Sequence, residues 1–221
     1  MIYEGHTDPA LVHALLQTLI KKGSKQAANG HFRGNVIRGG LRTLQEARWA
    51  EARPVRAEQS NTSIIFGDAM ILKVFRRVEA GENPDLEIGR HLTEVKFPHT
   101  PKFLGSIEYH RSKDEPLTLC VAQQFVQNEG DAWKYALGQA SQFFERALEA
   151  EDKLPKEHED EAGAAMLVHE ARREMPELIE EVVGQFAISC HLLGQRTAEM
   201  HQALATPLDN DAFKPEKFTK L

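Results

Sequence analysis

Residues 58–77 read EQSNTSIIFGDAMILKVFRR, and this stretch decides the fold. Two runs rich in apolar and β-branched residues lie on either side of Gly67-Asp68-Ala69. Apolar runs joined by a short glycine-containing turn are typical of a β-hairpin. We therefore predict a first strand over Ser63–Gly67 and a second over Met70–Arg76.

Lys73 stands inside the second of these strands. Strict alternation places it on the same face as Ile71 and Phe75, among apolar neighbours. An ammonium group in such surroundings is costly unless it is paired or bound to an anion. The alternative is an edge-strand lysine that guards against aggregation or extends to water. The residues by themselves favour neither interpretation.

The segments around the hairpin predict an antiparallel sheet with helices, an α+β fold. Four further segments read as strands: 31–38, 53–58, Phe103–Tyr109 and Leu117–Val126. The last of these is almost continuously apolar up to Ala122, which indicates a strand covered on both faces. Asn83-Pro84-Asp85 opens a helix that runs through Glu94, with acidic side chains in its first turn.

Helices are also predicted at both ends of the chain. Asp8-Pro9 is a helix-start pattern, and Gly23 is a plausible stop. After Gly130, which precedes an N-cap at Asp131 and an expected core residue at Trp133, the sequence reads as helical throughout. We expect one helix with an apolar stripe from Trp133 to Leu148, a second over 161–174 and a third from Pro176. The tail after Ala205 has no core of its own.

Composition and charge exclude several classes of protein. The 221 residues carry a net charge of −6, with +5 on residues 1–57 and −11 on residues 58–221, which argues against nucleic acid as the main partner. No apolar run is long enough to cross a bilayer, and the N-terminus lacks the features of a secretory signal. Cys120 and Cys190 lie in apolar stretches, so we expect two buried free thiols in a reducing compartment, the cytoplasm.

The order of elements from 53 to 126 matches the N-terminal lobe of kinase-like folds, whose chemistry needs donors around phosphates and a cation on them. The polar loop 58–63 offers Ser60, Asn61, Thr62 and Ser63 as short donors for a phosphate, although such residues also favour capped turns. A helical carboxylate could steady Lys73. Glu87 is our candidate, and Asp85 competes with it half a turn away.

The strand ending at Gln124, Phe125 and Val126 leads from the sheet into the helical region. A segment that joins two lobes commonly leaves backbone N–H and C=O groups unpaired at its edge, which would suit an adenine ring. A plain strand end is the other interpretation.

Several blocks of the sequence resemble one family closely. They are EQSNTSIIFGDAMILKVFRR (58–77), NPDLEIGRHLTE (83–94), FPHTPKFLGSIEY (97–109), QQFVQNEGDAWKYAL (123–137) and LLGQRTAEMHQALA (192–205). They are similar to bacterial maltokinases, above all to those fused behind trehalose synthase. Members of this family have the fold of aminoglycoside phosphotransferases and transfer the γ-phosphoryl group of ATP to maltose, giving maltose 1-phosphate for α-glucan (glycogen) synthesis.

The resemblance implies a role for each candidate residue. It assigns Ser60, Asn61, Thr62 and Ser63 to the phosphate loop, Lys73 to the α- and β-phosphates and Glu87 to an ion pair with Lys73. It assigns Gln124, Phe125 and Val126 to the hinge under adenine. It also divides the chain into an N-terminal cap (1–57), a nucleotide-binding lobe (58–130) and the helical start of a second lobe (131–221).

One departure from the family limits what these residues can do alone. The family's catalytic loop, His-Gly-Asp followed by His and Gln, and its later Asp-Phe-Glu-type stretch for Mg²⁺ do not occur in residues 1–221. Phosphoryl transfer needs both a base and metal ligands. We therefore expect ATP and Mg²⁺ as cofactors of a longer enzyme, and at most weak nucleotide binding and no turnover by these residues alone.

Two rival interpretations remain open. The chain could be a non-catalytic kinase-like module that docks trehalose synthase. It could also belong to a kinase for another small alcohol, such as an aminoglycoside or choline. A zinc protease is excluded because His158-Glu159 and His169-Glu170 lack the second histidine of an HExxH motif.

Overall fold

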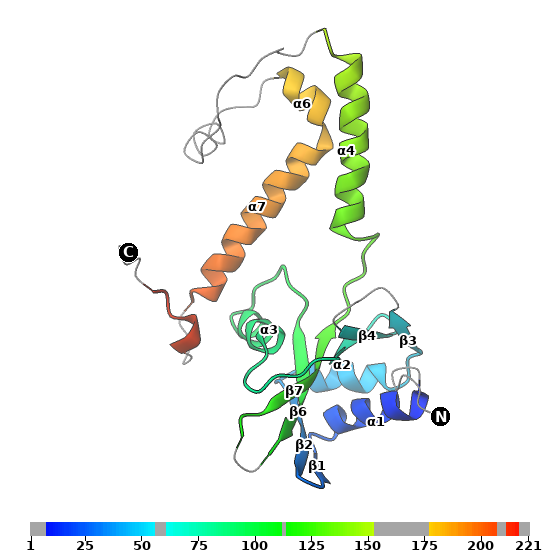
Figure 1. Ribbon diagram of the computed structural model, residues 1–221, viewed down its shortest axis with the longest axis vertical. Helices are drawn as coiled ribbons and strands as arrows, with labels where there is room; N and C mark the ends of the chain where they lie inside the picture. The colour runs from blue at the N-terminus through cyan, green and yellow to red at the C-terminus, as the bar shows by residue number, and fades with distance from the viewer. Residues whose placement is uncertain (1–7, 56–60, 112–113, 153–176, 207–210, 217–221) are drawn as a thin grey trace. The chain divides into compact units, whose positions relative to one another are not determined.

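The computed structural model describes residues 8–55, 61–111, 114–152, 177–206 and 211–216 (Figure 1). The chain forms two compact units. Residues Met1–Gln127 and Met200–Leu221 make up the first, which we call the sheet unit, and residues Asn128–Glu199 make up the second, the helical unit. The predicted helix over 161–174 lies outside the described residues.

The sheet unit is built on one antiparallel sheet of seven strands in the order β1-β2-β6-β7-β5-β4-β3. The strands are β1 (Ser24–Ala27), β2 (Gly30–Val36), β3 (Ala52–Val55), β4 (Asn61–Phe66), β5 (Met70–Phe75), β6 (Phe103–His110) and β7 (Leu117–Gln124). The predicted hairpin is β4–β5, closed by Gly67 at φ 52° with Ala69 N–H donating to the Phe66 carbonyl at 3.1 Å. The α+β prediction is confirmed.

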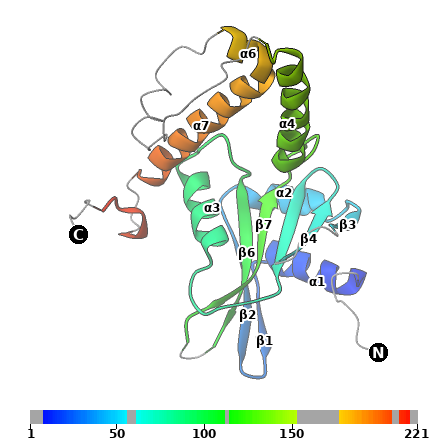
Figure 2. The same ribbon diagram turned by 45° about the horizontal axis from the view of Figure 1, so that its top comes forward.

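Helices cover both faces of this sheet. Figure 1 and Figure 2 show the central strands between α3 (Pro84–Glu94) on one side and α1 (Pro9–Ile20) and α2 (Gly40–Ala47) on the other. The larger apolar cluster joins Leu16, Leu19 and Leu44 of α1 and α2 to buried residues of β4–β7, while a smaller cluster joins Leu86 of α3 to Phe103 and Val121. The strand β7 is therefore covered on both faces, as its apolar run predicts.

The caps of α1 and α3 follow directly from the sequence. The Asp8 side chain accepts a hydrogen bond from Ala10 N–H at 2.8 Å, and the Asn83 side chain accepts one from Asp85 N–H at 2.9 Å. In each case the next residue is a proline, which lacks an N–H and carries a φ suited to the first helical position. Both predicted helices are confirmed.

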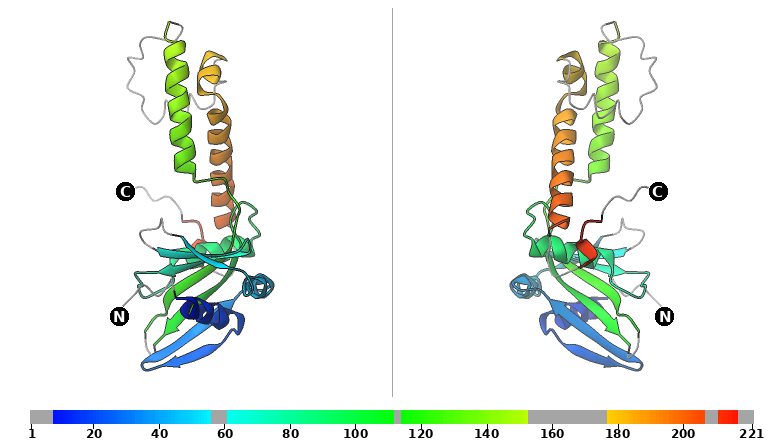
Figure 3. Two further views of the ribbon diagram at one scale, coloured as in Figure 1. Left: turned by 90° about the vertical axis from the view of Figure 1, so that its right-hand side faces the viewer. Right: turned by 90° about the vertical axis from the view of Figure 1, so that its left-hand side faces the viewer.

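The first 57 residues contribute more to the sheet than the sequence indicates. Strand β1 and helix α2 were not predicted, because SKQA is polar and α2 begins at two glycines. Gly39 adopts φ 88°, and a Cβ on Gly40 would lie 2.6 Å from the Leu104 carbonyl oxygen. The hairpin β1–β2, blue in Figure 3, pairs with β6, so the sheet runs without a break across the division predicted at residue 57.

The helical unit contains α4 (Ala132–Glu149), α6 (Glu177–Val183) and most of α7 (Gln185–Leu204). The Asp131 side chain caps α4, and the backbone N–H of Lys134 lowers the pKa of this carboxyl below its ordinary value. The third predicted helix is instead two helices, because Gly184 at φ 62° ends the first of them. Trp133, expected in a core, is 72% exposed within the described part of the chain.

The two cysteines differ in their surroundings. Cys120 is buried in the larger apolar cluster, as predicted, and burial raises its pKa to about 12. Cys190 is exposed on α7, so the expectation of a second buried thiol is wrong. Within the described ranges, no helix combines the length and the apolar character that a bilayer crossing requires.

Gly34→Ala tests the packing of α1 on the sheet. A Cβ at Gly34 would lie 2.3 Å from the Thr18 carbonyl oxygen, so a backbone must shift, and we expect a loss of about 3 kcal/mol in the free energy of unfolding. The matched control is Gly138→Ala in α4, whose Cβ would meet nothing within 4 Å. It should be neutral or stabilising by about 0.5–1 kcal/mol. Urea unfolding measures both, and equal effects would contradict the close approach.

Thiol titration with a disulfide reagent tests the burial of Cys120. The native chain should react with one equivalent, at Cys190, because a buried thiol with a pKa of about 12 is neither accessible nor ionised at pH 8. The second equivalent should appear only in denaturant. Rapid modification of Cys120 in the native chain, identified by peptide mass, would contradict this burial.

Candidate functional site

The candidate site is centred on Lys73, which lies in an interior strand of the sheet. β5 is hydrogen-bonded to β4 on one side and β7 on the other, with Lys73 opposite Ser63 and Val121. The edge-strand interpretation of this lysine is therefore wrong. Its side chain is 28% exposed and projects on the α3 face, where Phe75 packs against the smaller apolar cluster.

The carboxylate paired with Lys73 is that of Asp85. The Nζ atom of Lys73 lies 3.4 Å from Oδ2 of Asp85, so the predicted ion pair with Glu87 is wrong. Successive helical residues are rotated by about 100°, so Asp85 and Glu87 lie on opposite flanks of buried Leu86 and cannot both face the lysine. A direct contribution of Glu87 to nucleotide binding stays a prediction.

The predicted phosphate loop is shorter than the sequence suggests. Asn61, Thr62 and Ser63 belong to strand β4, where they pair with Phe75, Val74 and Lys73, and Thr62 and Ser63 are buried. Thr62 also accepts a hydrogen bond from Nε of Arg76 at 3.0 Å. The hairpin extends this far because Thr62 and the two isoleucines after Ser63 favour strands. Ser60 lies outside the described residues, and phosphate binding by all four stays a prediction.

The predicted hinge begins with two amides that are already paired. Gln124 N–H donates to the Lys102 carbonyl at 2.8 Å, and Phe125 N–H donates to the Ala69 carbonyl at 3.1 Å. The expectation that these N–H groups would be unpaired is therefore wrong. Val126 follows the end of β7 with its side chain 54% exposed. Adenine binding along Gln124–Val126 stays a prediction.

The sheet brings Lys73 and the predicted hinge onto neighbouring strands. Gln124 pairs with Met70 of β5, three residues before Lys73. At about 3.3 Å per residue, these positions are roughly 10 Å apart along the strand. The half-buried ammonium and the start of the hinge thus lie within the reach of a single small ligand.

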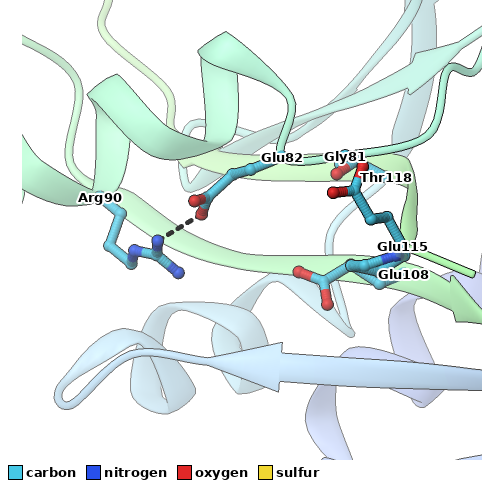
Figure 4. Close-up of a pocket in the computed structure, with 7 residues that line it drawn as sticks. Gly81, Glu82, Arg90, Glu108, Glu115 and Thr118 are labelled. Carbon is cyan, nitrogen blue, oxygen red and sulfur yellow. Dashed lines mark hydrogen bonds and ion pairs between the residues drawn. The ribbon is translucent and has the colours of Figure 1, made fainter. Parts of the chain in front are cut away.

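A polar pocket on the same face was not predicted. It has a volume of about 370 Å³ between α3 and strands β6 and β7. Its lining residues are Pro116 and the six that Figure 4 labels, Gly81, Glu82, Arg90, Glu108, Glu115 and Thr118. Arg90 pairs with Glu82, and Glu108 accepts a hydrogen bond from Ser106 Oγ at 3.1 Å and pairs with His110 at 3.1 Å. None of the predicted site residues lines this pocket. Among the described residues, no group of three or more His, Cys, Asp or Glu could hold a metal ion.

The sequence presents Asp85 only as a competitor of Glu87. The position of Asp85 directly after Pro84, at the start of the helix, is the pattern that could have favoured it. Helix starts lie close to the strand that precedes them when the connection is short, and only eight residues separate Phe75 from Pro84. Spacing along the helix cannot show which flank faces the lysine.

A double-mutant cycle distinguishes the two carboxylates. Changing Lys73→Met together with Asp85→Asn should give a coupling free energy of about 0.5–1 kcal/mol, since both side chains are partly exposed. The matched cycle of Lys73→Met with Glu87→Gln should give a value close to zero. Urea unfolding of the single and double variants supplies the values, and a larger coupling to Glu87 would reverse the assignment.

Comparisons with known proteins support the fold. No protein-family model matches the chain. A solved structure of glucosamine kinase in complex with glucosamine, ADP and inorganic phosphate is similar with a TM-score of 0.50 and 17% sequence identity, over 90% of this chain and 36% of that chain. A second glucosamine kinase structure, crystal form B, has a TM-score of 0.48 and 19% identity, over 89% of this chain and 37% of that one. The chain thus spans little more than a third of the length of these proteins. Its similarity to the glucosamine kinase structure with bound ADP supports a kinase-like α+β fold.

Proposed function

We propose that this chain is the nucleotide-binding part of an ATP-dependent sugar kinase. The observation that supports this most is the half-buried ammonium of Lys73, in an interior strand and paired with a carboxylate from the helix packed on the same face. A strand lysine steadied by a helical acid is what a kinase-like lobe needs to bind the α- and β-phosphates of ATP. Here the acid is Asp85.

In this proposal each described element has a separate task. Lys73 neutralises phosphate charge, and Asp85 orients the ammonium without consuming all of its three N–H donors. The segment Gln124–Val126 lies beside the adenine, while Asn61–Ser63 lie near the phosphates. Bound Mg²⁺ supplies further neutralisation of phosphate charge. Its ligands, like the catalytic base, are expected outside these 221 residues.

The acceptor proposed from the sequence is maltose. The neighbouring solved structure, whose bound sugar is glucosamine, favours an amino sugar as the second candidate. A trehalose synthase domain or subunit as partner rests on the maltokinase resemblance. The chain spans only about a third of the length of the similar structure. We therefore propose that residues outside this sequence bind the acceptor. Assays of ATP consumption by that protein with each sugar would identify it.

Substitution of Lys73 tests nucleotide binding directly. Lys73→Met removes the ammonium and leaves the Asp85 carboxylate to repel the phosphates. The affinity for Mg·ATP should therefore fall about 10- to 100-fold, which corresponds to the loss of one charge-assisted hydrogen bond. Lys25→Met, which removes an exposed lysine from edge strand β1, is the matched control and should bind like the wild type. Calorimetric titration with Mg·ATP measures both. Unchanged affinity in a folded Lys73→Met variant would reject the proposal.

A further inference from the structure

A buried histidine lies on the helix that carries Asp85. His91 of α3 is 3% exposed, and its Nε2 atom lies 3.2 Å from the carbonyl oxygen of Ala203, 112 residues further along the chain. A carbonyl oxygen can only accept a hydrogen bond, so Nε2 must be the protonated nitrogen and the donor. This contact fixes the ring against a segment that is distant in sequence.

An aromatic ring closes over the same histidine. Phe213, in the short turn Asp211–Phe213, stacks on the His91 imidazole with the ring centroids 3.9 Å apart and the planes inclined by 24°. Ala203 and the turn Asp211–Phe213 both belong to the sheet unit, and we call them together the C-terminal strap. The strap therefore contacts His91 in two ways, through a hydrogen bond and through ring stacking.

The opposite side of α3 is fastened to the sheet. Thr93 Oγ1 accepts a hydrogen bond from Phe103 N–H at 2.8 Å, and a Cβ on Gly89 would come within 3.4 Å of Gln123 Nε2. These contacts and those of His91 all lie in the second half of the helix. The first turn carries Asp85, six residues from His91, or about 9 Å along the helix axis. A shift of α3 at His91 would therefore be transmitted to Asp85 as a rigid movement.

We propose that His91 and Phe213 are positioning residues for the Lys73–Asp85 pair. The C-terminal strap presses α3 onto the sheet and thereby holds the Asp85 carboxylate within reach of the Lys73 ammonium. Release of the strap lets α3 move away, and the lysine loses its partner. The role of this pair in nucleotide binding rests on the proposed function above. The dependence of the pair on the strap does not rest on that function.

The reactivity of Lys73 reports on this coupling without any assay of activity. Trinitrobenzenesulfonate is an anion, so it reacts faster with a lysine whose neighbouring carboxylate has moved away and left the side chain more accessible. For a partly exposed pair, the increase expected in Phe213→Ala is about two- to fivefold. Peptide mass spectrometry gives the rate at Lys73 alone. Hydrogen exchange of the α3 amides should also rise, while exchange in β7 stays as in the wild type.

Two further variants separate positioning from a general loss of stability. Phe213→Tyr keeps a ring on His91 and should restore the wild-type labelling rate. Phe97→Leu removes another ring beside a histidine, since Phe97 lies edge-on to His99 at 5.6 Å, but it leaves the strap intact and should not alter Lys73. Faster labelling in Phe97→Leu, or faster exchange throughout the sheet in Phe213→Ala, would overturn the proposal in favour of general destabilisation.

Labelling of Lys73 also distinguishes the proposed nucleotide site from the proposed role of the strap. Mg·ATP should slow the labelling of Lys73 in the wild-type chain if the proposed nucleotide site is correct. Absence of such protection, together with faster labelling in Phe213→Ala, would reject the nucleotide site and support the strap. Unchanged Lys73 labelling and unchanged α3 exchange in Phe213→Ala would reject the strap, whatever Mg·ATP does.

Discussion

The constraint on which the architecture depends is the positive charge of Lys73 in an interior strand. Its neighbours across the ladder, Ser63 and Val121, are buried, and its own face of the sheet packs an apolar cluster. An ammonium in that position needs an anionic partner because the surrounding side chains cannot replace its hydration. Helix α3 supplies the partner, and the apolar packing of α3 on the sheet brings the Asp85 carboxylate to the lysine.

Two kinds of packing hold α3 in place. On the sheet side, Leu86 enters an apolar cluster with Val121, and the absence of a side chain at Gly89 allows a close approach to β7. On the other side, His91 is covered by a segment from the far end of the chain. The charged pair at Lys73 is modest in strength, so its geometry depends on these larger contacts.

The two faces of the sheet are specialised by what covers them. Helices α1 and α2 cover one face with the larger apolar cluster, including Leu16, Leu19 and Leu44, and make it a closed core. The α3 face is only partly covered, so Lys73 and the pocket beside Arg90 remain accessible. This asymmetry favours ligand chemistry on the α3 face, where the charged groups of Lys73, Asp85 and Arg90 meet both the sheet and solvent.

The sequence by itself determined the local structure: the β4–β5 hairpin, the caps at Asp8 and Asn83, and the burial of β7, because turn chemistry and apolar periodicity act over a few residues. It also singled out Lys73. Only the tertiary structure decided that Asp85 and not Glu87 meets the lysine, that Asn61–Ser63 continue a strand, and that Phe213 covers His91. These depend on helix rotation, strand pairing and contacts between distant segments, which periodicity along the chain does not specify.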